Sequence, residues 1–184
     1  MKKYFFTSLL LLLNKFLGVR KFVFTLLLTG LMLGQAVAAD FLPVRFGLPK
    51  GEAVSAFTQL WGCPVETTEN AITFYNVELD GFCFDRVVLG FEDAAHGGYF
   101  NQARLFITRP VRRQAVVQRD SLARRLSTQY GYGMTRDYEE NGNKFYKGGI
   151  SPEGIGFLFT IYTQRRQGQW STELRYGAFH KLKR

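Results

Sequence analysis

The sequence predicts an α+β domain in which two helices pack on one face of an antiparallel sheet of six or seven strands. Two segments, 50–61 and 110–130, have apolar residues at helical spacing, and each is followed by a glycine. Segments of alternating apolar and polar residues surround them, joined by hairpin signals such as Asp80-Gly81. The expected element order is β-α-β-β-β-α-β-β-β.

The first half of the domain begins with a short apolar strand over residues 41–46. Pro49 suits the first turn of the helix at 50–61, which Gly62 and Pro64 end. Strands at 71–79 and 82–91 follow as a hairpin around Asp80-Gly81.

In the strand at 82–91, one face is expected to carry Cys83, Val87, Leu89 and Phe91, with Asp85 in the same phase. An inward carboxylate needs a partner, and the neighbouring Arg86 faces the other way.

The second half repeats this plan with a strand at 101–108 and a helix from Pro110 to about Tyr130. Residues 136–147 are either two short strands around Asn141-Gly142 or one irregular strand. Residues 154–164 alternate as a strand, and residues 165–169 turn the chain into a last strand at 170–176. The residues of 154–164 expected to face inward are Ile155, Phe157, Phe159 and Ile161.

The two halves share a weak internal similarity. Trp61-Gly62 closes the first helix much as Tyr130-Gly131 closes the second. Two copies do not establish a repeat array, and shared helix-to-sheet geometry explains the similarity equally well.

Residues 1–39 have the layout of a secretory signal peptide: basic residues, an apolar run, then Ala36-Val37-Ala38. Cleavage near Ala38 or Ala39 would leave one domain over 40–180 and a basic tail over 181–184, in the periplasm or outside a bacterial cell. Neither apolar run, 4–13 or 22–33, reaches the roughly 18 residues of a spanning helix, so no stable membrane anchor is expected. Residues from Val19 onward form a complete leader, which makes Val19 an alternative start.

The charge of the chain excludes one class of partner. The net charge is +9, but five basic residues and no acid precede residue 40, so the rest of the chain carries +4. A nucleic-acid partner is therefore not expected.

The cysteine count predicts a disulfide between Cys63 and Cys83, because exported chains with an even number of cysteines favour one. Two separate thiols are the alternative. No metal or other cofactor is expected, since two cysteines without nearby histidines fall short of four zinc ligands.

No catalytic residue is predicted. The two histidines, His96 in a loop and His180 in the tail, have no nucleophile signature beside them. Carboxylates gather near Asp85 and near Asp137, but solvated loop or strand ends explain them. The glycine-rich stretch 147–154 lacks phosphate-loop spacing.

Aromatic residues on the strands are the candidate binding surface, because an exposed aromatic patch marks protein or glycan recognition. A second covering layer or a dimer would explain them as well. The helix at 110–130 also carries five arginines that spread around it without forming a stripe. The aromatic candidates are Tyr75, Phe82, Phe84, Tyr162 and Tyr176.

Residues 46–54, Phe-Gly-Leu-Pro-Lys-Gly-Glu-Ala-Val, and 60–64, Leu-Trp-Gly-Cys-Pro, resemble the opening of small exported bacterial domains. These are the β-lactamase-inhibitor-protein-like and SmpA/OmlA outer-membrane assembly types. The resemblance covers about 20 residues, and here Leu-Pro replaces Met-Ser/Thr and no lipoprotein cysteine is present. It implies a non-catalytic binding module of the bacterial envelope.

The sequence therefore predicts an exported, non-enzymatic binding or envelope-accessory protein whose partner is a protein or glycan of the cell envelope. A small carboxylate-dependent hydrolase of cell-wall or glycan material and a protein inhibitor are the alternatives. A hydrolase needs two acids that converge in a cleft, with the pKa of at least one raised.

Overall fold

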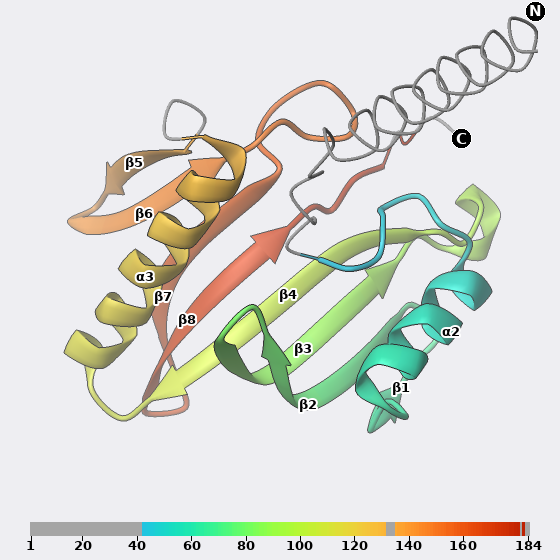
Figure 1. Cartoon of the computed structure of the whole chain (residues 1–184), viewed down its shortest axis with the longest axis horizontal. Helices are drawn as coiled ribbons and strands as arrows, with labels where there is room; N and C mark the ends of the chain where they lie inside the picture. Colours follow the sequence, from blue (N-terminus) through green and yellow to red (C-terminus); the bar gives the residue numbers. More distant parts are fainter. Residues whose placement is uncertain (1–41, 132–134, 181, 183–184) are drawn as a thin grey trace, which may run out of the picture. The chain divides into compact units, whose positions relative to one another are not determined.

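The computed structural model describes residues 42–131, 135–180 and 182 (Figure 1). The chain divides into two units, Met1–Ala39 and Asp40–Arg184, and every described residue belongs to the second. The predicted signal peptide and its cleavage site lie outside the described residues.

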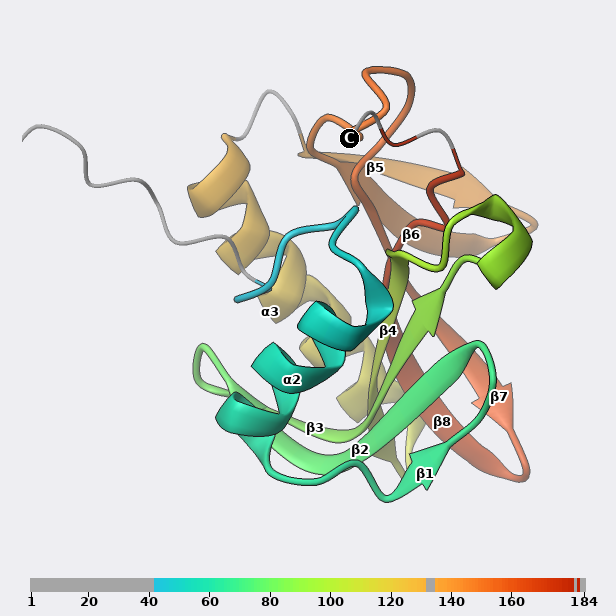
Figure 2. The same ribbon diagram turned by 90° about the vertical axis from the view of Figure 1, so that its right-hand side faces the viewer.

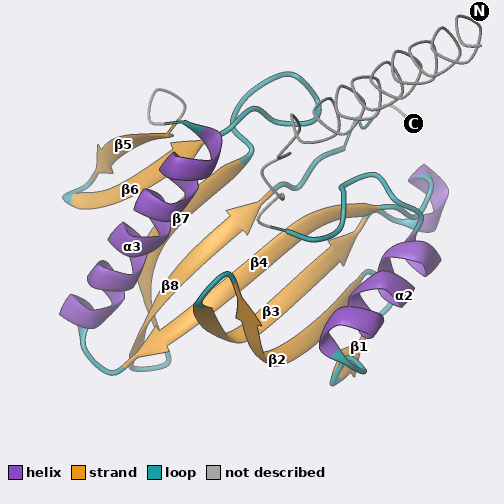
Figure 3. Cartoon of the chain, in the orientation of Figure 1, coloured by secondary structure: helices purple, strands orange, loops and turns teal. Residues whose placement is uncertain are grey.

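The described residues form one antiparallel sheet of eight strands in the order β1-β2-β3-β4-β8-β7-β6-β5 (Figure 3). The α+β class and the antiparallel sheet are confirmed, whereas the predicted number of six or seven strands is wrong. The strands are β1 (Glu66–Thr67), β2 (Ala71–Leu79), β3 (Phe82–Phe91), β4 (Phe100–Arg109), β5 (Thr135–Glu140), β6 (Asn143–Gly148), β7 (Phe159–Arg166) and β8 (Gln169–Tyr176).

Three differences explain the strand count and order. Residues 42–46 bend and turn instead of forming the expected first strand. The short β1 pairs with β2, and residues 136–147 form two strands, β5 and β6. The strand expected from 154 begins only at Phe159, so Ile155 and Phe157 are exposed in the preceding loop.

Three hairpins close through two-residue turns in which both central residues have positive φ. The turns are Asp80-Gly81, Asn141-Gly142 and Gln167-Gly168. Type I′ turns need this backbone conformation because its twist matches that of the flanking strands. Local sequence therefore fixes the register of β2–β3, β5–β6 and β7–β8.

Helices α2 (Lys50–Trp61) and α3 (Arg112–Tyr130) lie on the same face of the sheet (Figure 2). Phe57 of α2 and Leu122 and Leu126 of α3 share one core with Leu105 of β4 and Leu174 of β8. The element order is thus a helix followed by four strands, twice, and the two halves meet where β4 pairs with β8.

The alternation of faces breaks in the middle of the β2–β3 hairpin. Asn76 has a φ of 54°, and the pairing of β2 with β3 skips it. As a result Phe84 and Val87, three residues apart, are both fully buried. Cys83 therefore lies outside the core face.

The predicted disulfide is not formed. Cys63 and Cys83 are both exposed free thiols. The break in alternation also removes Cys83 from the face that was expected to carry it together with Val87, Leu89 and Phe91.

Asp85 is also placed by this break and does not enter the core. Its carboxylate is about half exposed and lies 3.9 Å from the Arg109 guanidinium. It also accepts a hydrogen bond from the Thr108 backbone N–H.

None of the helices in the described part of the chain is long and apolar enough to cross a bilayer.

Candidate functional site

The sheet face opposite the helices carries a row of side chains across five strands. Register places Tyr75 of β2 beside Arg86 of β3, Arg86 beside Phe106 of β4, and Phe106 beside Glu173 of β8. Tyr162 of β7 ends the row next to Glu173. Directly paired residues of antiparallel strands point to the same side, so these five side chains form one surface. We call it the open-face row.

Phe106 is the centre of the row, and it is only 3% exposed although it lies on the face without helices. Three guanidinium groups lie over its ring, an arrangement that cation–π attraction favours. The groups of Arg86, Arg104 and Arg166 lie 4.4, 5.2 and 5.8 Å from its ring centroid.

Glu173 is fully buried beside Phe106. Its carboxylate accepts hydrogen bonds from Arg104 Nε at 2.7 Å, Gln164 Nε2 at 2.8 Å and Arg175 Nε at 3.0 Å. Such a set of donors is what a buried carboxylate requires.

Burial acts to raise the pKa of Glu173, but hydrogen bonds from Arg104 and Tyr162 and the arginine charges outweigh it and lower the pKa overall. Burial and the contact with Glu173 raise the pKa of Tyr162, so its hydroxyl stays protonated. Around Glu173, one negative charge is thus shared between the positive charges of Arg104 and Arg175.

The first half of the row borders an open groove of about 520 Å³. Among the described residues, neither Arg86 nor Arg166 has a carboxylate within 4.0 Å of its nitrogens. A guanidinium stacked on a ring keeps its N–H edge available for carboxylate or phosphate. The groove is lined by Tyr75, Asp85, Arg86, Phe106, Thr108, Arg166, Gln167, Gln169 and Ser171.

Two hydroxyl groups at the groove, those of Tyr75 and Ser171, differ in their hydrogen bonding. The Tyr75 hydroxyl donates to the Glu66 carboxylate of β1 at 2.9 Å, and this hydrogen bond raises the pKa of Tyr75. The Ser171 hydroxyl is buried and has no hydrogen-bond partner among the described residues. An unsatisfied buried hydroxyl costs free energy, which a ligand atom reaching it would recover.

The five predicted aromatic residues separate into two groups. Tyr75 and Tyr162 belong to the open-face row. Phe84 and Tyr176 are buried in the core beneath the helices, and Phe82 packs against that core. The predicted five-residue patch is therefore not one surface.

The residues that complete the row did not come from the aromatic prediction. Arg104, Phe106, Glu173 and Arg175 occupy positions that alternate with core residues of β4 and β8. Alternation could identify their face, but it could not show that Glu173 is buried there.

The acidic residues do not form a hydrolytic pair at the groove. Asp85 is the one carboxylate among the described residues that line it. Elsewhere, hydrogen bonds from His180, from His96 backbone and side chain, and from Lys144 lower the pKa of Glu92, Asp93 and Asp137 respectively. These shifts are opposite to that of a general acid.

A second cavity of about 560 Å³ lies where residues 42–46 approach the loop after β6. Leu42, Phe46, Leu158 and other apolar side chains line it, and Arg45 is its charged residue. It lacks the converging polar groups that orient a ligand, and we assign it none.

Comparison with known proteins finds no match: no family model fits the chain, and neither a curated protein nor a solved structure matches it. The resemblance of residues 46–64 to β-lactamase-inhibitor-protein-like and SmpA/OmlA domains stays a prediction.

Proposed function

We propose that this chain is an exported, non-enzymatic binding protein of the bacterial envelope that docks an acidic segment of a partner protein in the groove of its open sheet face. The observation that carries the proposal is the pair Arg86 and Arg166, stacked on Phe106 and without a carboxylate within 4.0 Å among the described residues. Export rests on the layout of residues 1–39.

The groove favours an acidic partner because its charge is not neutralised by the fold. Arg104 and Arg175 are bound to Glu173, whereas Arg86 and Arg166 keep their N–H edges for a ligand. Cation–π contact with the Phe106 ring restrains Arg86 at 4.4 Å and, more weakly, the exposed Arg166 at 5.8 Å, which lowers the entropic cost of ordering them on binding. Charge-assisted hydrogen bonds of this kind are among the strongest in proteins.

A protein segment fits better than a neutral glycan. Glycan sites use aromatic faces to stack on sugar rings, but here the Phe106 ring is covered by arginines. A hydrolase is disfavoured because Asp85 has no second carboxylate beside it in the groove among the described residues.

The test measures binding of a fluorescent hexaglutamate peptide by anisotropy, at low and at physiological salt. The wild-type protein is expected to bind it with an affinity that falls as salt rises. Arg86→Glu and Arg166→Glu should each weaken binding by about tenfold or more, since each replaces an attraction with a repulsion. A neutral cell-wall oligosaccharide should not compete.

Arg113→Glu is the matched control, because Arg113 is exposed on α3, on the other side of the sheet, and the charge change is the same. Equal loss of binding in Arg113→Glu and Arg86→Glu would show that the effect is one of net charge and contradict the proposal.

A second experiment identifies the partner by capture from an envelope extract. The partner is the protein that wild type and Arg113→Glu both retain and that the Arg86→Glu/Arg166→Glu double variant does not.

A further inference from the structure

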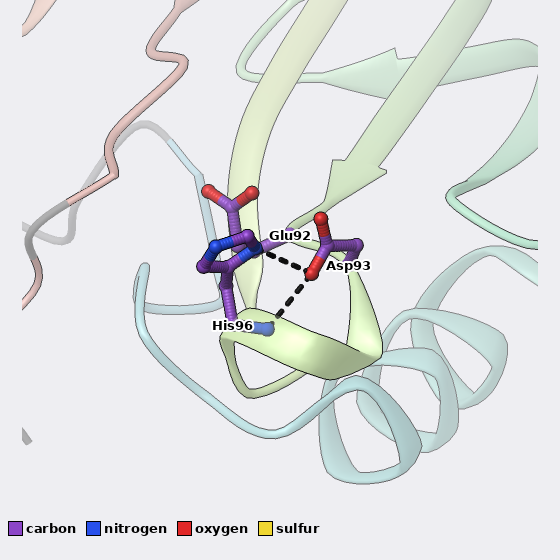
Figure 4. Close-up of side chains that lie close together, drawn as sticks. All are labelled: Glu92, Asp93 and His96. Carbon is purple, nitrogen blue, oxygen red and sulfur yellow. Dashed lines mark hydrogen bonds and ion pairs between the residues drawn. The ribbon is translucent and has the colours of Figure 1, made fainter.

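The loop between β3 and β4 gathers metal-ligating side chains that the open-face row does not use. Glu92, Asp93 and His96 each offer one ligand atom, and these three atoms all lie within 4.8 Å of one another. Figure 4 shows the three side chains close together at one turn, with the imidazole of His96 directed at the Asp93 carboxylate.

The chain has two histidines, and the fold brings both of them to this turn. His96 Nδ1 lies 2.7 Å from Asp93 Oδ1. His180, 88 residues beyond Glu92, places its Nδ1 2.7 Å from Glu92 Oε2. Two neighbouring carboxylates therefore each contact an imidazole from a different part of the sequence.

We propose that Glu92, Asp93 and His96 form a binding site for a divalent transition metal of the zinc type. Imidazole nitrogen with carboxylate oxygens is a donor set that suits Zn²⁺, and the imidazole disfavours Mg²⁺ and Ca²⁺, which prefer oxygen alone. Three protein ligands leave a fourth tetrahedral position open to water or to a group from a partner.

To hold the metal, the ligand atoms must move: the 2.7 Å contact opens, and ligand atoms that lie up to 4.8 Å apart close, to roughly 3.3 Å. The metal takes the place between His96 Nδ1 and Asp93 Oδ1, and the neutral imidazole binds it through Nδ1 as the tautomer that carries its one proton on Nε2. Bonds of about 2.0–2.1 Å at tetrahedral angles set neighbouring ligand atoms roughly 3.3 Å apart, so the 2.7 Å contact opens slightly. His96 is exposed and can move by this amount.

The surrounding structure orients Glu92 for this role. Asn101 Nδ2 at 3.1 Å and His180 Nδ1 both bond Glu92 Oε2, which holds the carboxylate in place. The turn itself is closed by backbone bonds from Glu92 to Tyr99 and from Gly98 to Asp93. His180 is therefore a positioning residue, and outer partners of this kind typically change metal affinity by about 10- to 100-fold.

The test is calorimetric titration of the purified protein, without a polyhistidine tag, with Zn²⁺ and separately with Mg²⁺ near neutral pH. One Zn²⁺ per chain with a dissociation constant of about 10 µM or tighter is expected, and no heat of binding with Mg²⁺. Absence of saturable Zn²⁺ binding, or equal binding of Mg²⁺, would overturn the proposal.

Variants separate a built site from adventitious surface binding. His96→Ala and Asp93→Asn should weaken Zn²⁺ binding at least about tenfold, while Asp137→Asn, an exposed carboxylate on β5, should leave it unchanged. His180→Ala should weaken it about tenfold, and His180→Asn, which keeps an N–H donor near the position of Nδ1, should restore most of the affinity. Unaltered binding in His96→Ala, or equal loss in Asp137→Asn, would refute the site. Circular dichroism of each variant confirms that it is folded.

Discussion

The two halves of the domain have the same order of elements, and both helices bury apolar side chains against the sheet, but α3 also buries a charged residue, which α2 does not. In the first half, Phe57 of α2 packs against the rings of Trp61 and Phe100 at centroid distances of 4.8 and 5.3 Å. In the second half, α3 buries Arg119, whose Nη1 donates to the Lys144 carbonyl at 2.8 Å. Equal topology therefore does not require equal packing, because a sheet face can be covered by apolar area or by satisfied polar groups.

The open sheet face also differs from one end to the other, in whether its arginines are paired with a carboxylate. Glu173 of β8 pairs with Arg104 of β4 and Arg175 of β8, and so offsets one of their two positive charges. The first half has no equivalent acid in the row beside Arg86. Arginines near Glu173 are thus paired within the fold, whereas Arg86 of the first half and Arg166 of the second keep their N–H groups for an anion.

The largest expected effect comes from the aromatic packing of the first half. Phe57→Ala should lower the free energy of unfolding by about 3–5 kcal/mol, because it removes a fully buried ring and leaves a cavity. Urea unfolding followed by circular dichroism measures this. Phe157→Ala, which truncates an exposed ring in a loop, serves as control and should change stability by about 1 kcal/mol or less.

Glu173→Gln should lower the free energy of unfolding by roughly 1.5–3 kcal/mol at neutral pH, because the amide is a weaker acceptor for the Arg104 and Arg175 guanidiniums. The same unfolding measurement applies, and Glu139→Gln, an exposed position on β5, is the control. A variant as stable as wild type would show that the hydrogen bonds and ion pairs of Glu173 only offset the free-energy cost of burying its charge.

The stabilisation by Glu173 should depend on pH. Its pKa in the folded protein lies below the ordinary value of 4.5, so its contribution is complete above that value and is lost as pH falls through the folded pKa. The difference in unfolding free energy between wild type and Glu173→Gln should therefore shrink below about pH 4.5. A difference that stays constant down to acid unfolding would contradict this assignment.

The smallest effect is expected at the buried arginine of the second half. Arg119→Met should lower the free energy of unfolding by about 1–2 kcal/mol, since the Lys144 carbonyl loses this donor while the partner carboxylate, Asp120, is exposed enough to be solvated. Asp120 stays partly exposed and keeps the hydrogen bond from the Tyr146 hydroxyl at 3.0 Å. A loss of more than about 3 kcal/mol would mean that the ionic cluster is essential for seating α3, and the two halves would then differ more than proposed.

Local sequence was sufficient where the structure is decided within a few residues. Asp80-Gly81 and Asn141-Gly142 adopt the two-residue turns that their residue types favour. Both helices end before glycines with positive φ, Gly62 and Gly131. Alternation also assigned Phe159 and Ile161 to the core.

Local sequence failed where one residue changed the phase of a strand. Asn76 in a left-handed conformation shifts the faces of β2 and β3, so that Cys83 and Asp85 do not lie where strict alternation put them. The pairing leaves both Asn76 and Asp85 without a partner, and strict alternation along either strand could not predict this.

The sequence by itself determined the α+β class, the two helices, the hairpins and most of the core, because these depend on propensities and periodicities of neighbouring residues. Only the tertiary structure decided that Glu173 is buried under arginines, that Arg86 and Arg166 share one ring, and that His180 reaches Glu92. Each of these depends on strands and loops distant in the chain, and the pairing of β4 with β8 that joins the two halves leaves no local trace in either strand.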